Sequence, residues 1–273
     1  MVVAKNFKNS RYRIDAPKDS IEVLKIVDAC KGEIMPKVAI HTAAVSIRDP
    51  LLIETRNSLD QFLGKGGIWR IWAKNDDKLQ SLDIPMPLLE AGIFIHNGPD
   101  DSLYDALNKL LMHEVADYFM TLGCGDTLVP AAADRVLNAV IGQPDSTLIC
   151  FPLYHQGFKR ILYPSPAELS IRMACPHPST LLHTNSVKCV GGYSMSYQIA
   201  ADYDLMCRLI KFRPRARVED GALVNYLSGG MSEKRGFEGM VEEELIRHRV
   251  WGGSVAQLAY SLSLRCTNIL HKR

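Results

Sequence analysis

The sequence predicts an α/β fold in which helices flank a mixed, mostly parallel sheet. Short apolar runs rich in β-branched and aromatic residues alternate with stretches of helical periodicity for about 110 residues from position 38, which is the pattern of parallel β-α-β units. Hydrophobic residues make up 47% of the 273-residue chain, enough for a substantial core, and this excludes intrinsic disorder. The length fits one large α/β unit with added segments at its ends.

The first β-α-β unit is expected between residues 38 and 72. Val38–Ile40 is an apolar strand, and Asp49 before Pro50 is typical of a helix start. Periodic leucines predict one helix from there until Gly67, before the aromatic strand Ile68–Trp72. Because a crossover helix joins the two strands, they are expected to pair in parallel.

Two more strand and helix pairs follow. The strand Gly92–His96 leads into a helix that Asp100 or Asp101 is expected to cap, and the strand Tyr118–Leu122 precedes a helix that starts after Pro130. The remaining expected elements are strands within Ser146–Tyr154 and Lys159–Tyr163 and helices over Ala200–Phe212 and Glu242–Arg249.

The overall charge and the cysteines exclude several classes of protein. With 32 Lys and Arg against 30 Asp and Glu, the net charge of +2 gives no support to electrostatic capture of nucleic acid. The seven cysteines are odd in number and lack a C-x-x-C spacing, which argues against a disulfide framework or a structural zinc site. The polar N-terminus and the lack of ~18 consecutive apolar residues predict a cytoplasmic protein, at most peripheral at the inner face of the cell membrane.

Acidic residues near strand ends are the candidates for chemistry, because ligands of open α/β sheets bind outside the carboxyl ends of the strands. Asp126 follows such a strand after two glycines and could hold Mg²⁺ or Mn²⁺, or else belong to an ordinary Gly-Asp turn. Asp202 and Asp204 stand next to apolar residues, where a partly buried carboxylate could serve as a base or cap a helix. For Asp204, capping or pairing with Arg208 at i,i+4 is the favoured interpretation.

A third polar group lies on the helix expected after the strand Gly92–His96. Asp101, Asp105 and Asn108 share one side of that helix, while leucines occupy the other side. The group is either a ligand-binding surface or the solvated face of an amphipathic helix.

Five segments carry, in order and spacing, the motifs of a known family: Asp100–Lys109, Asp117–Asp126, Pro176–Thr180, Val190–Tyr193 and Ile199–Leu205. Together they resemble family 2 glycosyltransferases, and within them the bacterial colanic-acid-type enzymes of polysaccharide biosynthesis. The resemblance covers roughly residues 36–232.

The resemblance implies the GT-A fold over 37–232, with a Rossmann-like nucleotide-binding half to about residue 130 and an acceptor half after it. A helical arm over 1–36 and a C-terminal helical extension over 233–273 complete the expected organisation. The resemblance also implies the reaction: a sugar is transferred from a nucleotide diphosphate-sugar donor to a saccharide or lipid-linked acceptor, with inversion at the anomeric carbon and assisted by Mn²⁺ or Mg²⁺.

Individual residues are assigned by their position in the motifs. Asp126 matches the last acid of the metal-binding Asp-x-Asp motif, and Asp202 matches the acid that serves as catalytic base. Four more residues match segments that shape the donor site or lie beside the sugar and acceptor: Asp101, Tyr104, Asn108 and His177.

The sequence departs from the family pattern at three places, and one further segment matches it. The first strand ends in His41-Thr42-Ala43, where relatives usually have Thr-Tyr-Asn. Cys124 stands where relatives have the first metal-binding acid, which leaves Asp126 as the obvious ligand. Asp76 or Asp77 is expected to replace the acidic motif that grips the base and ribose. Ser228–Ser232 resembles the Gly-Gly-x-Ser turn near the donor diphosphate, where backbone N–H groups could cradle phosphate or simply form a loop.

Two other functions remain open. A sugar nucleotidyltransferase shares the Rossmann-like start but needs a glycine-rich phosphate loop after the first strand, and His41–Arg48 contains no glycine. A catalytically degenerate glycosyltransferase-like subunit could instead be a scaffold in an assembly complex. The basic residues of the C-terminal extension would suit a membrane surface or a lipid-linked acceptor, although packing on the catalytic core is the favoured role.

Overall fold

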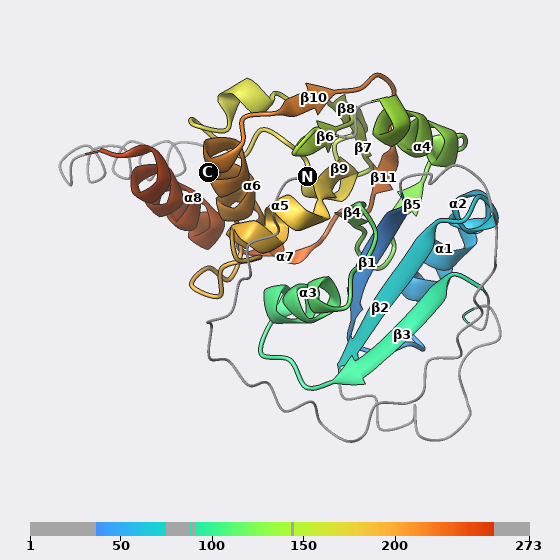
Figure 1. Ribbon diagram of the computed structural model, residues 1–273. Helices are drawn as coiled ribbons and strands as arrows, with labels where there is room; N and C mark the ends of the chain where they lie inside the picture. The colour runs from blue at the N-terminus through green and yellow to red at the C-terminus, as the bar shows by residue number, and fades with distance from the viewer. Residues whose placement is uncertain (1–36, 75–87, 89–90, 143–144, 254–273) are drawn as a thin grey trace, which may run out of the picture. The chain divides into compact units, whose positions relative to one another are not determined.

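The computed structural model describes residues 37–74, 88, 91–142 and 145–253 (Figure 1). The chain separates into one unit at Met1–Ile34 and a second at Met35–Arg273, and every described residue belongs to the second unit. The predicted arm over 1–36, Asp76, Asp77 and the end of the predicted C-terminal extension lie outside the described residues.

Among the described residues, seven strands form the main sheet in the order β10-β6-β9-β4-β1-β2-β3. Their bounds are β1 Val38–Ala44, β2 Ile68–Lys74, β3 Ile93–Gly98, β4 Tyr118–Thr121, β6 Leu148–Cys150, β9 Thr180–His183 and β10 Ala216–Val218. β1 pairs in parallel with β2 and β4, and β2 pairs in parallel with β3. The predicted α/β class with a mostly parallel sheet is therefore confirmed.

Strand β9 is the exception in direction. It runs antiparallel to both of its neighbours, with Cys150 of β6 opposite Thr180 and Phe119 of β4 opposite Leu182. Reversal brings the residues that precede β9 to the edge where the parallel strands end. The chain that leads into β9 is therefore placed beside the segment that follows β4.

A smaller four-stranded sheet in the described part of the chain has the order β5-β11-β7-β8. Its strands are β5 Thr127–Leu128, β7 Leu153–His155, β8 Arg160–Leu162 and β11 Val224–Tyr226. β7 follows β6 directly and pairs in parallel with β11. The predicted strand region Ser146–Tyr154 is thus divided, because the chain leaves the main sheet after Cys150 and enters the smaller one.

The helices cover both faces of the main sheet (Figure 1). Their bounds are α1 Pro50–Asn57, α2 Asp60–Gly64, α3 Leu103–Met112, α4 Ala132–Gly142, α5 Thr184–Cys189, α6 Ala201–Phe212, α7 Met231–Lys234 and α8 Gly236–Trp251, with 3-10 turns η3 Pro166–Glu168 and η4 His177–Ser179. Within the described ranges, no helix has the length and apolar character needed to cross a membrane.

Alternation along the strands produces one apolar core on each face. Ile40 and Met120 belong to the core that includes residues of α1, α2 and α4, whereas Ala39 and Phe119 belong to the core with α3, α5, α6 and α8. Successive strand residues point to opposite faces, so both faces of β1 and β4 are apolar and buried. Helix α8 packs through Ile246 into the second core.

Two local predictions were wrong in detail. The expected single helix after Pro50 is broken into α1 and α2, because the chain turns at Ser58 and Leu59. Helix α3 is capped by Ser102, whose Oγ accepts the Asp105 N–H at 3.2 Å, and not by Asp100 or Asp101. The Asp49 cap of α1 is confirmed, since its carboxylate accepts the Leu51 N–H.

Asp204 stabilises the packing of α6 and α8. Its carboxylate is 0% exposed and accepts bonds from Arg208 Nε at 2.8 Å and from the Arg249 guanidinium of α8. The interpretation of Asp204 as the partner of Arg208 is confirmed, and this ion-paired carboxylate is structural.

Replacing Asp204 with Ala is expected to lower the free energy of unfolding by about 2–3 kcal/mol, somewhat less than for a fully buried pair because both guanidiniums reach solvent. Asp134→Ala is the matched control, since its pair with Lys65 is exposed and such pairs contribute about 0–1 kcal/mol. Chemical denaturation of the two variants measures the difference; equal losses would contradict a structural role for Asp204.

Candidate active site

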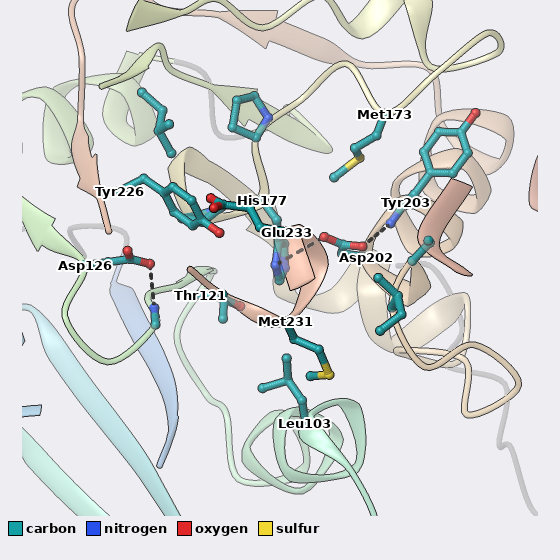
Figure 2. A pocket seen from close by; sticks show the side chains of 18 of the residues that line it. Leu103, Thr121, Asp126, Met173, His177, Asp202, Tyr203, Tyr226, Met231 and Glu233 are labelled. Atoms are coloured by element: carbon teal, nitrogen blue, oxygen red, sulfur yellow. Dashed lines mark hydrogen bonds and ion pairs between the residues drawn. The ribbon is translucent and has the colours of Figure 1, made fainter. Parts of the chain in front are cut away.

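A cavity of about 610 Å³ opens beside the carboxyl ends of the central strands. It is lined by residues from the segment after β4, the turn before β9, the start of α6 and the chain from β11 to α8. Four predicted residues line it together, namely Tyr104, Asp126, His177 and Asp202. Figure 2 shows Asp126 and Asp202 on two sides of the cavity, with His177 and Glu233 drawn between them.

Asp126 is held by backbone N–H groups from two segments. Its Oδ2 accepts the Gly123 N–H at 3.1 Å and its Oδ1 accepts the Leu227 N–H at 2.8 Å. Gly125 has φ +89°, and a Cβ there would lie 2.5 Å from the Leu227 side chain, so this tight turn requires glycine. Each carboxylate oxygen keeps a lone pair for a further ligand.

The two candidate metal ligands of this turn differ in charge. Burial raises the pKa of Asp126 to about 6, against the two N–H bonds, which lower it. Burial, with the nearby Asp49 and Asp126 charges, raises the pKa of the Cys124 thiol to about 12. At neutral pH, Asp126 is therefore ionised and Cys124 is a neutral thiol, which is a poor ligand for Mg²⁺ or Mn²⁺.

Asp202 lies in the first turn of α6 with its side chain 21% exposed. Its Oδ1 accepts the Tyr203 N–H at 2.8 Å and lies 3.3 Å from the Tyr104 hydroxyl, which donates to Ile199 O at 2.5 Å. Its Oδ2 is 3.9 Å from His177 Nδ1. One oxygen is thus fixed by backbone, while the other faces the cavity and His177.

His177 belongs to a short chain of polar side chains. Its Nε2 is 2.9 Å from the Tyr193 hydroxyl, which is 3.3 Å from Thr121 Oγ1. Burial lowers the pKa of His177 against the opposing effect of the Asp202 carboxylate, so its imidazole is neutral at pH 7. Burial also raises the pKa of Tyr193. A neutral imidazole can pass on or accept a hydrogen bond without adding charge beside Asp202.

The cavity has an acidic lining, free of lysine and arginine in the part that the structure describes. Its described lining contains four carboxylates, those of Asp126, Asp202, Glu233 and Glu243, and no lysine or arginine. The Glu233 carboxylate has two polar neighbours, because its Oε1 is 3.2 Å from His155 Nε2 and its Oε2 accepts the Gly229 N–H at 2.9 Å. An anionic ligand such as a diphosphate would need a cation to bind here.

The residues predicted to shape the donor site lie in different positions. Tyr104 lines the cavity, whereas Asn108 supports it from behind by bonding the N–H and the C=O of Tyr193 at 2.9 Å each. Gly192, with φ +71°, leaves room for that amide, since a Cβ there would lie 2.6 Å from Asn108 Oδ1. Asp101 is exposed and absent from the described cavity lining. Roles in donor binding for Asp101 and Asn108 stay predictions.

Four polar residues of this region have no role predicted from the sequence. Tyr193 belongs to the motif Val190–Tyr193, but nothing in that motif indicates its contacts with His177 and Thr121. The contact between His155 and Glu233 joins β7 to α7, and the Glu242 carboxylate of α8 accepts backbone N–H groups of the loop before Asp202. Nothing local in the sequence indicates these long-range contacts.

Known proteins are similar to this chain in fold, but no match was found by sequence. No model of a protein family matches the sequence, and no curated protein sequence matches it. S. aureus TarS 1-349 in complex with UDP-GlcNAc is similar in structure, with a TM-score of 0.59 and 12% identity over 83% of this chain and 70% of that chain.

A second similar structure is the mannosyltransferase PcManGT from Pyrobaculum calidifontis in complex with GDP-Man and Mn²⁺. It has a TM-score of 0.58 and 13% identity over 80% of this chain and 65% of that chain. The chain therefore has the fold of these proteins, a mostly parallel sheet flanked by helices. At such identities the similarity establishes the fold alone, and the activity must be argued from the cavity.

Proposed function

We propose that this protein is an inverting glycosyltransferase of family 2 that transfers a sugar from a nucleotide diphosphate-sugar to a saccharide or lipid-linked acceptor. The observation that carries the proposal is the opening of Asp126 and Asp202 into one cavity at the carboxyl edge of the sheet. The fold shared with a protein crystallised with UDP-GlcNAc and one with GDP-Man and Mn²⁺ supports it. The motif resemblance favours a role in bacterial surface polysaccharide synthesis at the cytoplasmic side of the membrane.

The reaction assigns different work to the two carboxylates. The acceptor hydroxyl oxygen attacks the anomeric carbon while the bond from that carbon to the donor's phosphate oxygen breaks, and the electron pair leaves with the nucleotide diphosphate. Asp202 accepts the hydroxyl proton as general base. Attack from the side opposite the leaving group inverts the configuration, as the activated water does in inverting glycosidases.

The cavity fits a divalent cation that protein and donor would hold jointly. Asp126 can offer a lone pair from each oxygen, and the described residues contain no group of three or more ligating side chains that could hold a metal alone. Mg²⁺ sites commonly combine one or two carboxylates with substrate phosphates. When bound, the cation would neutralise charge on the departing diphosphate. Asp126 would hold it, and Cys124 as a neutral thiol would not.

One observation favours the alternative, a degenerate scaffold subunit. Cys124 occupies the position of the first metal-binding acid, and both oxygens of Asp126 are already engaged by backbone N–H groups. If these bonds are purely structural, the cavity has no cation and repels nucleotide diphosphates.

A thermal-shift screen separates the two functions. UDP-, GDP- and dTDP-sugars are tested with Mn²⁺ and with a chelator, and the matching nucleoside monophosphate serves as the control without a diphosphate. A ligand at about 100 times its Kd stabilises the native state by about 2.7 kcal/mol, which corresponds to a shift of about 5 °C or more. We expect such a shift for one nucleotide class, only with Mn²⁺. No shift with any diphosphate favours the scaffold.

A further inference from the structure

Helix α8 holds the loop that leads into Asp202. The carboxylate of Glu242 accepts the backbone N–H groups of three consecutive residues: its Oε1 accepts Gln198 N at 2.9 Å, and its Oε2 accepts Ile199 N at 2.8 Å and Ala200 N at 2.9 Å. These residues line the cavity immediately before α6. One side chain of α8 is thus the hydrogen-bond acceptor for three consecutive backbone N–H groups before α6.

The Glu242 contact ends at the start of α6, because Ala200, the last of its three partners, is the N-cap residue of that helix. The N-cap residue of α6 is Ala200, which has no side chain able to accept a hydrogen bond. The buried N–H groups of the N-cap and the preceding loop need an acceptor, and Asp202 in the first turn is the nearest carboxylate on the helix itself. An acid in the first turn of a helix can reach back to the N-cap N–H, as in a capping box. With Glu242 present, Asp202 bonds one backbone N–H, that of Tyr203, and its Oδ2 stays directed to the cavity side.

Two further contacts fix the loop Gln198–Ala200. The Tyr104 hydroxyl donates to the Ile199 carbonyl at 2.5 Å, on the other side of the peptide from Glu242. Helix α8 also approaches Ile199 closely, since a Cβ on Gly239 would lie 3.0 Å from Ile199 Cγ2. The backbone at Ile199 is therefore fixed on both its N–H and its C=O, three residues before Asp202.

We propose that Glu242 is a positioning residue for the Asp202 base: by accepting the loop N–H groups up to that of Ala200, it keeps the Asp202 carboxylate from turning back to bind them. The inference rests on the proposed function. It makes α8 part of the catalytic architecture, although its Glu242 carboxylate bonds only backbone and touches no substrate. Removing that carboxylate releases three N–H groups, and the Asp202 carboxylate rotates towards them and away from the acceptor hydroxyl.

Steady-state kinetics of Glu242→Ala, Glu242→Gln and Glu238→Ala test the proposal, with the sugar nucleotide found in the screen. Displacement of a catalytic group by about 1 Å costs about 10²-fold, so Glu242→Ala should lower kcat about 100-fold and leave the KM for donor within about twofold. Glu242→Gln should retain kcat within about tenfold, because its amide oxygen can still accept the Ile199 and Ala200 N–H groups. Glu238, an exposed residue one turn earlier that pairs with Arg235, is the matched control and should keep full activity.

A double-mutant cycle with Asp202→Asn distinguishes positioning from general destabilisation. If Glu242 acts through Asp202, then Glu242→Ala should change the residual rate of Asp202→Asn by less than about threefold. A role in stability alone would lower the rate by the same factor in both backgrounds, and that result would overturn the inference. Unchanged kcat in Glu242→Ala overturns it as well and leaves the proposed function intact. A wild-type protein that turns over no sugar nucleotide refutes the proposed function itself.

Discussion

Replacing Asp202 with Asn should lower kcat for sugar transfer by about 10³-fold, within the range by which a general base accelerates a reaction. The asparagine oxygen can still accept the Tyr203 N–H and the side chain keeps its size, so the start of α6 should be preserved. Donor affinity should change little, because Asp202 lies apart from Asp126, where the diphosphate is proposed to bind. Initial rates, donor affinity by calorimetry and thermal midpoints measure the three quantities separately.

A matched control is Asp134→Asn on α4. This residue forms an exposed pair with Lys65 on the opposite face of the sheet, and its loss should leave kcat unchanged. Wild-type rates in the Asp202→Asn variant would remove Asp202 as the base. A large fall in donor affinity would instead indicate that Asp202 binds the donor.

Replacing Asp126 with Ala should weaken binding of the nucleotide diphosphate-sugar by about 10²-fold, which is what loss of a key contact in a metal site commonly costs. The remaining carboxylates of the cavity would face the diphosphate without a bound cation between them. Calorimetry with and without Mn²⁺ measures the effect, and the variant should show the same weak binding in both conditions. Binding to the wild-type protein that survives thorough chelation would contradict a metal role.

The role of Asp126 can also be tested through the pH dependence of donor binding. Because burial raises the pKa of Asp126 to about 6, its carboxylate takes up a proton as the pH falls through 6, well before an ordinary aspartate would. Metal-dependent donor affinity should fall about tenfold for each pH unit below that point and level off above it. In the Asp126→Ala variant this dependence should be absent. A wild-type profile that stays flat down to pH 4 would contradict the role of Asp126.

The layered fold was largely predictable because its signals are local. The strands β1 and β3 are apolar runs followed by periodic helices, and Asp49 before Pro50 is a standard start signal for α1. The break between α1 and α2 was not predictable, since leucines recur on both sides of it. The direction of β9 was also hidden, because a four-residue strand buried on both faces reads the same in either direction.

The site residues that lie at strand ends or within family motifs were predictable from the sequence. Asp126 follows a glycine after a strand, and Asp202 lies at the start of a helix. A carboxylate at such a position can be recognised from the sequence as a candidate site residue. The contacts that determine their behaviour come from residues far away in the chain, such as Leu227 for Asp126 and Glu242 for Ile199. Glu242 occurs in an acidic stretch of a helix and resembles a solvated residue. Only the packing of α8 against α6 reveals its three backbone partners.

The central claim is that Asp126 and Asp202 serve two ends of one donor in one cavity. A crystal structure of the Asp202→Asn variant with Mn²⁺ and the sugar nucleotide from the screen tests it most directly, because this variant should bind the donor without consuming it. We expect the cation and diphosphate at Asp126 and the sugar in the cavity, with its anomeric carbon open to the side chain at position 202. A nucleotide bound outside this cavity, or a diphosphate that makes no contact with the cation at Asp126, would contradict the account.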